Sequence, residues 1–184
     1  VFSPSATANY SVVGTNTLTG CTSTNNAVVT VTVNALPVVS ASASNTFICI
    51  NNTVTLNGAG AGSYTWTSSA PGSYSNSVAF SPTTTANYTV VGTNTLTGCT
   101  STNNAVVTIT VNTLPTVTAA VTSSVICNTQ TIAVNGSGAN TYTWVASAGS
   151  NPVNGTAFSP SATANYSVSG TNSLTGCTST NVAF

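Results

Sequence analysis

Residues 80–112 read FSPTTTANYTVVGTNTLTGCTSTNNAVVTITVN, and close copies of this stretch begin at Phe2 and Phe158. The three starts keep a constant step, because 80 − 2 and 158 − 80 both equal 78. Two further pairs of landmarks keep the same step: Cys49 and Cys127, and Trp66 and Trp144. A fixed period of this kind is the signature of tandem structural units.

Leu-Pro pairs mark the boundaries between these units. They occur in Ala35-Leu36-Pro37 and in Thr113-Leu114-Pro115, and because Pro is excluded from central strands we interpret each pair as a short stiff linker. The sequence predicts three domains: residues 1–34 as the C-terminal half of a β-sandwich repeat, residues 35–112 as a complete repeat, and residues 113–184 as a third repeat that lacks most of its last strand. We expect an internal piece of a longer repeat protein, or a polymer subunit cut out of step with its domains.

Alternation of apolar and polar residues predicts short strands throughout the complete unit. The expected strands are Val38–Ser44, Thr53–Asn57, Ser63–Ser68, Val78–Phe80, Ala86–Thr93 and Ala105–Val111. No stretch has the 3.6-residue period of an amphipathic helix. The predicted fold class is therefore all-β, with tandem immunoglobulin-like β-sandwich repeats that share the period of 78. The large aromatic residues predicted for the cores are Trp66, Tyr88, Trp144 and Tyr166.

The 184 residues include no Asp, Glu, Lys, Arg or His. General acid–base catalysis needs a group that titrates near neutral pH, and a Ser or Cys nucleophile needs an activating base. Metal ions prefer carboxylate, His or clustered Cys ligands, and phosphates are bound by Lys and Arg. The composition therefore argues against an enzyme, a metal or cofactor site and a nucleic-acid partner. No apolar run of about 20 residues is present, so we expect no direct membrane insertion.

The cysteines are placed as if to stabilise each small unit with one disulfide. Cys49 and Cys99 have the same separation as Cys127 and Cys177, because 99 − 49 and 177 − 127 both equal 50. We expect disulfides Cys49–Cys99 and Cys127–Cys177, with Cys21 bonded to a cysteine upstream of the chain. A bridge that closes a loop of this size stabilises by roughly 4 kcal/mol. Buried free thiols and bridges between units are the alternatives. Disulfides indicate an oxidising, extracellular or cell-surface location.

The unit also resembles a known family. The resemblance lies in Ile48-Cys49, Tyr64-Thr65-Trp66, Asn87-Tyr88-Thr89-Val90 and Thr97-Gly98-Cys99-Thr100. These motifs look like those of the immunoglobulin-like and PKD-like tandem repeats of Bacteroidota cell-surface adhesins secreted by the type IX system, among them giant gliding adhesins. The resemblance implies an extracellular β-sandwich array that serves as a stalk or adhesin and has no catalytic residues. The total lack of charge departs from what we expect of that family.

Two functions are open on these observations. The first is a structural repeat segment of an extracellular filament, stalk or adhesin that gives reach and surface attachment. The second is a binding module that recognises glycan, ice or a partner through an exposed Thr/Asn-rich face, such as the one expected around Thr108-Ile109-Thr110. Strand edges without Lys favour association, so we expect copies of the chain or neighbouring repeats as partners. Residues 28–34 could complete a neighbouring unit that lacks its last strand.

Overall fold

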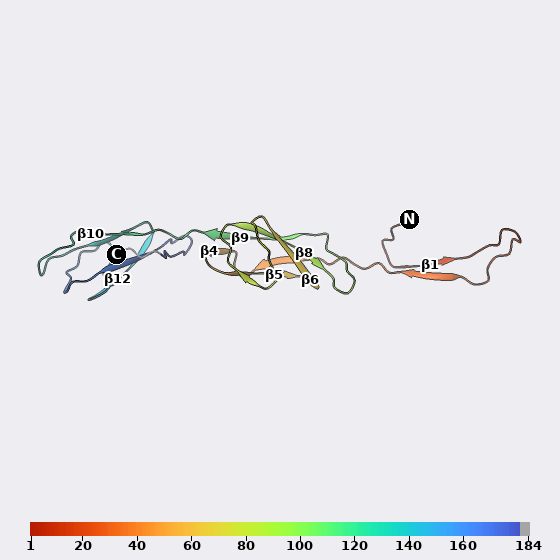
Figure 1. Cartoon of the computed structure of the whole chain (residues 1–184), viewed down its shortest axis with the longest axis horizontal. Coiled ribbons are helices and arrows are strands. Elements are labelled where there is room, and N and C mark those ends of the chain that lie inside the picture. Colours follow the sequence, from red (N-terminus) through yellow and green to blue (C-terminus); the bar gives the residue numbers. More distant parts are fainter. Residues whose placement is uncertain (181–184) are drawn as a thin grey trace.

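The computed structural model describes residues 1–180, and within them every regular element is a β-strand. The strands form three groups that follow one another along the long axis of the molecule (Figure 1). We call these groups the hairpin segment (residues 1–34), the central segment (residues 35–112) and the third segment (residues 113–180). The predicted all-β class is confirmed. The prediction that the last repeat ends within its final strand rests partly on Ala183 and Phe184, which lie outside the described residues.

The hairpin segment is a single antiparallel pair. Strands β1 (Ala8–Val12) and β2 (Ala27–Val31) pair so that Tyr10 faces Val29. No further strand covers either face in the described part of the chain, and Val28 and Val29 are 61% and 60% exposed. Val29 has the sequence position of Val107, which is half-buried in the central segment, whereas Val28 and its counterpart Val106 are both exposed.

The central segment contains two sheets with a common core. The first sheet has the order β3-β5-β7 and the second has the order β4-β9-β8-β6. The strands are β3 (Ser40–Ala43), β4 (Phe47–Cys49), β5 (Val54–Ala59), β6 (Ser63–Ser68), β7 (Ala79–Phe80), β8 (Ala86–Thr93) and β9 (Ala105–Asn112). Apolar residues of both sheets meet in one cluster, with Leu56 of β5 and Val90 of β8 fully buried. This two-layered arrangement is consistent with a β-sandwich.

The alternating patterns locate most of these strands. Strands β6 and β8 have the predicted bounds, and β9 extends one residue beyond its prediction. Alternation does not predict strand β4, because its three residues are too few to show the pattern. It pairs with β9 in parallel, whereas β8 pairs with β9 antiparallel.

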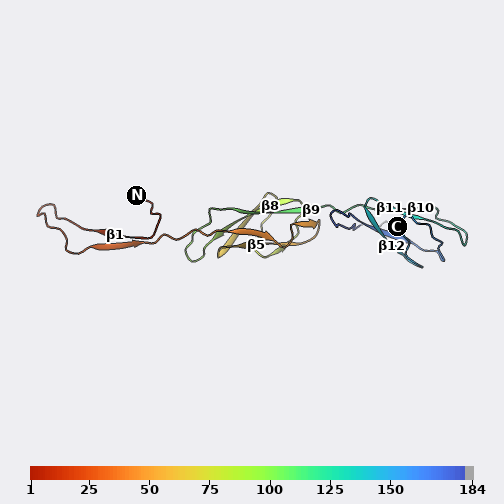
Figure 2. The same ribbon diagram turned by 180° about the vertical axis from the view of Figure 1, so that it is seen from behind.

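The third segment has the counterparts of only some of these strands. Strands β10 (Thr118–Val121) and β11 (Val134–Ser137) form one antiparallel pair, and β12 (Thr141–Ala146) and β13 (Tyr166–Thr171) form another. A smaller apolar cluster around Val134, Trp144 and Val168 holds the two pairs together. The rear view shows this group at the end of the row opposite to the hairpin (Figure 2).

A hydrogen-bonded asparagine fixes the core Trp in both larger segments. The Trp66 indole N–H donates to Oδ1 of Asn76 at 3.1 Å, and the Gly58 N–H donates to the same oxygen at 2.6 Å. The corresponding bonds of Asn154 in the third segment are 3.0 Å from Trp144 and 2.6 Å from Gly136. A buried indole N–H needs an acceptor, and this side chain supplies one.

Each linker is held against a turn that requires glycine. Gly60 has a φ of 95°, and a Cβ at this residue would overlap the Val38 carbonyl oxygen, just after the first Leu-Pro pair. Gly138 has a φ of 97° and stands in the same relation to Thr116. Only Gly combines this left-handed conformation with so close a backbone approach. The turns therefore fix how the chain enters each segment.

Candidate functional site: the junction between the central and third segments

Because the chain has no charged side chains, we looked for its functional site among contacts between its segments. The sequence has no ionisable carboxylate, amine, guanidinium or imidazole side chain. Within residues 1–180 there is no cluster of three or more potential metal-ligating side chains, and no helix long and apolar enough to cross a bilayer. A covalent contact between two segments is the most distinctive local feature.

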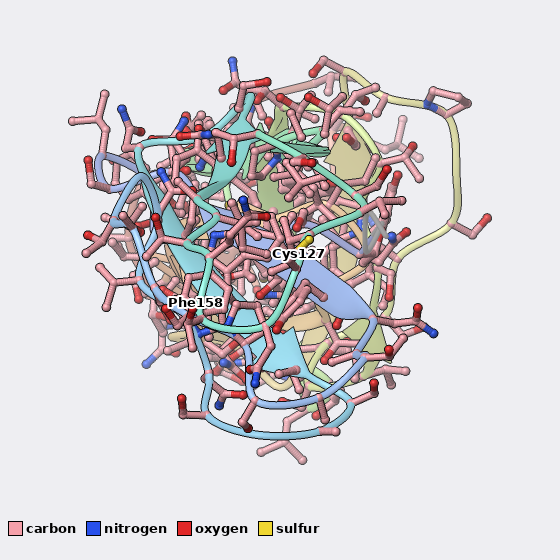
Figure 3. All side chains as sticks on the ribbon, turned by 90° about the vertical axis from the view of Figure 1, so that its left-hand side faces the viewer. Cys127 and Phe158 are labelled. Atoms are coloured by element: carbon pink, nitrogen blue, oxygen red, sulfur yellow. A yellow bond between two sulfur atoms is a disulfide. The ribbon has the colours of Figure 1, made fainter. Side chains whose placement is uncertain are left out.

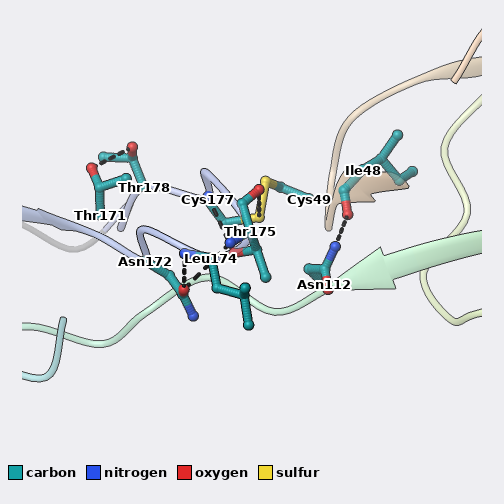
Figure 4. The surroundings of a disulfide bond; sticks show 9 residues. All are labelled: Ile48, Cys49, Asn112, Thr171, Asn172, Leu174, Thr175, Cys177 and Thr178. Atoms are coloured by element: carbon teal, nitrogen blue, oxygen red, sulfur yellow. Dashed lines mark hydrogen bonds between the residues drawn. A yellow bond between two sulfur atoms is a disulfide. The ribbon is translucent and has the colours of Figure 1, made fainter. Parts of the chain in front are cut away.

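A disulfide joins Cys49 of the central segment to Cys177 of the third segment (Figure 4). The two residues are 128 positions apart, and their Cα atoms are 5.6 Å apart, within the usual range for a bridge. Cys177 is 1% exposed. In the chain-entropy account, a bridge that closes so long a loop stabilises by about 5 kcal/mol. Here it also ties two neighbouring segments to each other.

Strand β4 brings Cys49 to this junction. Because β4 runs parallel to β9, Cys49 lies opposite Asn112, the residue that ends the central segment. The Ile50 N–H donates to the Asn112 carbonyl at 2.8 Å, and Nδ2 of Asn112 donates to the Ile48 carbonyl at 3.2 Å. The Ile48 side chain is buried in the core, which anchors the strand. Cys49 is thereby held where the chain leaves for the third segment.

A compact loop brings Cys177 to the same place. Oδ1 of Asn172 accepts hydrogen bonds from the N–H groups of Leu174 and Thr175, and the Asn172 N–H donates to the Cys177 carbonyl at 2.9 Å. Gly176 has a φ of 71°, the left-handed conformation that lets the loop turn back. The sequence Asn-x-Leu-Thr-Gly-Cys thus sets the position of the thiol by local bonds alone.

The same loop precedes Cys21 and Cys99. Oδ1 of Asn16 accepts from the Leu18 N–H at 2.9 Å, and Oδ1 of Asn94 accepts from the Leu96 N–H at 3.0 Å. Neither Cys21 nor Cys99 forms a disulfide in this structure. Within residues 1–180 the free cysteines are Cys21 and Cys127, which are exposed, and Cys99, which is half-buried.

The predicted pairs Cys49–Cys99 and Cys127–Cys177 are wrong in this structure. Cys49 lies beside the last residue of β9, whereas Cys99 precedes its first residue. The eight residues of β9 span about 27 Å at about 3.4 Å each. A disulfide needs Cα atoms no more than about 7 Å apart. The cysteines of the central unit therefore lie at opposite ends of it.

The predicted core aromatics have different degrees of burial. The exposed fractions of Trp66, Tyr88 and Trp144 are 5%, 1% and 3%, whereas Tyr166 is half-buried and packs at the edge of its cluster. Burial raises the pKa of the Tyr88 hydroxyl, and the neighbouring Tyr74 adds to the shift. Two neighbours of Tyr88 have no equivalent at Tyr166 in the described part of the chain: strand β9, which pairs with β8, and the Tyr74 ring, whose place in the sequence is taken by Pro152.

The third segment has a groove at the place that β9 occupies in the central segment. It measures about 970 Å³ and is lined by β10, by the loop around Cys127 and by residues 160–166. The end-on view, from the end opposite to the hairpin, labels Cys127 of this lining and Phe158, whose ring contacts Tyr166 of the lining (Figure 3). In the central segment the counterparts of these elements surround β9. The groove therefore has the lining of a strand site.

No protein-family model matches the chain, and no curated protein matches it.

Proposed function

We propose that the chain is a structural segment of an extracellular filament, stalk or adhesin, built from tandem immunoglobulin-like repeats that give reach and surface attachment. The observation that carries this proposal is the covalent junction: Cys49 and Cys177 tie consecutive segments that already follow one another along the long axis (Figure 1). A spacer needs length and resistance to separation, and this arrangement supplies both. A stable disulfide also favours an oxidising compartment outside the cytoplasm.

The composition supports a role that depends on shape. Trp66 and Trp144 are in the cores, where their N–H groups are bonded to Asn76 and Asn154, so neither ring is offered to a ligand. Large apolar residues are instead exposed on the hairpin and on the cysteine loops, with Leu18 and Leu174 at 95% and 92%. Exposed apolar groups without charge favour contact between copies.

Immunogold labelling of intact producing cells tests this proposal. Antibodies raised against the complete folded chain should label thread-like material that extends from the cell surface, without permeabilisation. Treatment with a reducing agent should shorten or fray the threads, because the junctions lose their bridges. Label confined to permeabilised cells would overturn the proposal.

A second candidate function rests on the outer face of the four-stranded sheet. Thr65 and Thr67 of β6 are exposed there, and Thr67 is directly opposite Thr89 of β8. Strand β9 continues this face with Thr108, which donates to Oδ1 of Asn87 at 2.7 Å. Such a flat array of hydroxyl and methyl groups could contact a glycan or an ice surface.

A glycan array and an ice-recrystallisation assay with the complete chain test this second function. If the face binds, Thr65→Val and Thr67→Val should abolish the signal, because they remove hydroxyls and keep the β-branched shape. The matched control is Thr102→Val, an exposed threonine outside the sheet. Absence of any signal from the unmodified chain would remove this candidate and leave the first untouched.

A further inference from the structure

The disulfide relates two different kinds of cysteine. We call Cys49 and Cys127 the first-position cysteines, and Cys21, Cys99 and Cys177 the second-position cysteines; each set keeps the period of 78. The observed bridge joins a first-position cysteine to the second-position cysteine of the next segment. It does not join cysteines of one segment.

We propose that this bridge recurs at every junction of the array, so that consecutive repeats form a disulfide ladder. Under this rule Cys127 bonds to the second-position cysteine of the unit that follows it, and Cys99 and Cys21 each bond to the first-position cysteine of the unit that precedes their own. The partner is another unit of the same kind, either in a longer chain or in a second copy. The inference deepens the proposed function and rests on it.

The rule explains why Cys21, Cys99 and Cys127 are the cysteines that are free. The observed separation is 128, with the first-position cysteine earlier in the chain. The rule therefore places the partners of Cys21 and Cys99 before the chain, since 21 − 128 = −107 and 99 − 128 = −29, and the partner of Cys127 after it, since 127 + 128 = 255. All three free thiols require partners from outside residues 1–184.

The two ends of the molecule carry complementary cysteines. The loop between β1 and β2, which contains the second-position Cys21, forms one end of the molecule (Figure 1). The loop between β10 and β11, which contains the first-position Cys127, forms the other end, and both thiols are exposed. A unit placed after the third segment in the way that the third follows the central one would meet Cys127 with a second-position cysteine.

Part of the local structure that surrounds the observed bridge is already present at these ends. The loop before Cys21 has the asparagine cap and the left-handed glycine, Gly20 at a φ of 71°, that are found before Cys177. At the other end the Gln130 N–H donates to the Cys127 carbonyl at 3.1 Å, as the Asn52 N–H does to the Cys49 carbonyl at 3.1 Å. The strand pairing that holds Cys49 has no counterpart at Cys127 within residues 1–180. The Cys21 loop therefore already has the form of the bridged Cys177 loop, and Cys127 keeps the turn that follows the bridged Cys49.

The chemistry of each bond is an oxidation of two thiols. Two Cys S–H groups lose two protons and two electrons as the S–S bond forms, and a low-molecular-weight disulfide takes both up and is reduced to two thiols. Such an oxidant is typical of the compartment in which structural disulfides persist. The step requires no other group.

A ladder of this kind limits how far the array can stretch. The step from a second-position cysteine to the next first-position cysteine is constant, since 49 − 21 and 127 − 99 both equal 28. A covalent path along the array can cross a bridge, which passes over 128 positions, and then follow the chain for 28 residues to the next bridge. Of every 156 residues, which are two periods, only 28 therefore lie on this path. Fully extended, one such stretch reaches about 100 Å. The rest of the chain is removed from the load.

Redox-buffered coupling of two variants of the complete chain tests the rule. One variant keeps Cys127 as its only free thiol (Cys21→Ser, Cys99→Ser), and the other keeps Cys21 (Cys99→Ser, Cys127→Ser); both retain Cys49 and Cys177. Equal amounts are mixed with oxidised and reduced glutathione, and dimers are identified by intact mass. We expect a roughly tenfold excess of the mixed dimer over each homodimer, because only the mixed pair docks end to end.

Random coupling of exposed thiols would instead give half mixed dimers and a quarter of each homodimer, and that result would overturn the rule. A variant of the second chain with Asn16→Ala provides a control for the docked loop, since it removes the cap and should lower the mixed excess without changing homodimer formation. Circular dichroism establishes that both variants are folded.

Disulfide mapping of the natural material distinguishes the two sources of the partner. In both cases, digestion without reductant should yield first-position peptides bonded to second-position peptides. If the units belong to one longer chain, reduction leaves its mass essentially unchanged. If the array is a polymer of copies, reduction releases shorter chains. Links within one unit would overturn the rule in both cases. Surface labelling together with a Cys49–Cys177 link, but with Cys21, Cys99 and Cys127 unlinked, would leave the proposed function standing and remove the ladder.

Discussion

Asn76 and Asn154 are hydrogen-bond acceptors that no sequence motif marks. Each accepts two hydrogen bonds, one from a core tryptophan and one from a backbone N–H. The pattern of apolar residues predicts that Trp66 and Trp144 are buried, but it cannot reveal their acceptors. The separation between Trp and Asn is 10 in both segments, within loops that hold many other Asn and Ser residues. Only the folded loop selects one of them.

Substitution of Asn76 by Ala should lower the free energy of unfolding of the central segment by about 2 kcal/mol, because two donors lose their acceptor in a poorly solvated place. Urea denaturation followed by Trp fluorescence measures this change. The matched control is Asn104→Ala, at an exposed position, which should change stability by less than about 0.5 kcal/mol. Equal effects of the two substitutions would contradict the role of Asn76.

Tyr88 should make the protein sensitive to alkali. Burial raises its pKa in the folded state above the unfolded value of 10.0, so the unfolded state loses its proton first as the pH rises. The stabilisation is therefore complete below about pH 9 and declines as the pH passes through 10 toward the raised folded-state pKa. Melting curves from pH 5 to 11, in a background of Cys21→Ser, Cys99→Ser and Cys127→Ser, measure the decline. Tyr88→Phe should flatten it, and an unchanged decline would refute this assignment.

At the scale of elements, alternation and turn residues predict strands but not their neighbours. Ser63–Ser68 and Ala86–Thr93 are predicted correctly because apolar residues recur in them at a period of two, two in the first strand and three in the second. The order of strands in the sheets is beyond such patterns. In particular, the parallel pairing of β4 with β9 depends on three residues whose partners, residues 110–112, come much later in the chain. That pairing decides which end of the segment Cys49 occupies.

A peptide with the sequence of residues 103–112, NNAVVTITVN, should bind the groove of the third segment and raise the melting temperature of the complete chain. In the central segment this sequence forms β9, and its Ile109 is fully buried. A peptide with Asn in place of Ile109 serves as the matched control, because it would bury an unpaired amide. Equal shifts with both peptides, or none with either, would show that the groove does not select a β9-like strand.

At the scale of the whole molecule, the period itself makes the disulfide pairing ambiguous. Cys99 and Cys177 occupy the same position in successive units, so the candidate partner of Cys49 in its own unit and the one 128 positions away have nearly the same local sequence. The sequence identifies which cysteine types can pair. The choice of unit depends on which thiols face each other across a junction, and that follows from the direction of β4 and the length of β9.

Single-molecule stretching should show that the bridge removes most of the chain from the load. When the complete chain is pulled from its two ends in the background of Cys21→Ser, Cys99→Ser and Cys127→Ser, the force passes directly from Cys49 to Cys177. The chain between the two cysteines, which are 128 positions apart, then carries no load and stays folded. Reduction of the bridge should add about 450 Å of contour length at about 3.5 Å per residue. A variant that also carries Cys49→Ser and Cys177→Ser should reach the longer value without reductant. If the oxidised chain already extended to that length, force would be passing through the folded segments, and the junction could not serve as the inextensible tie that a stalk requires.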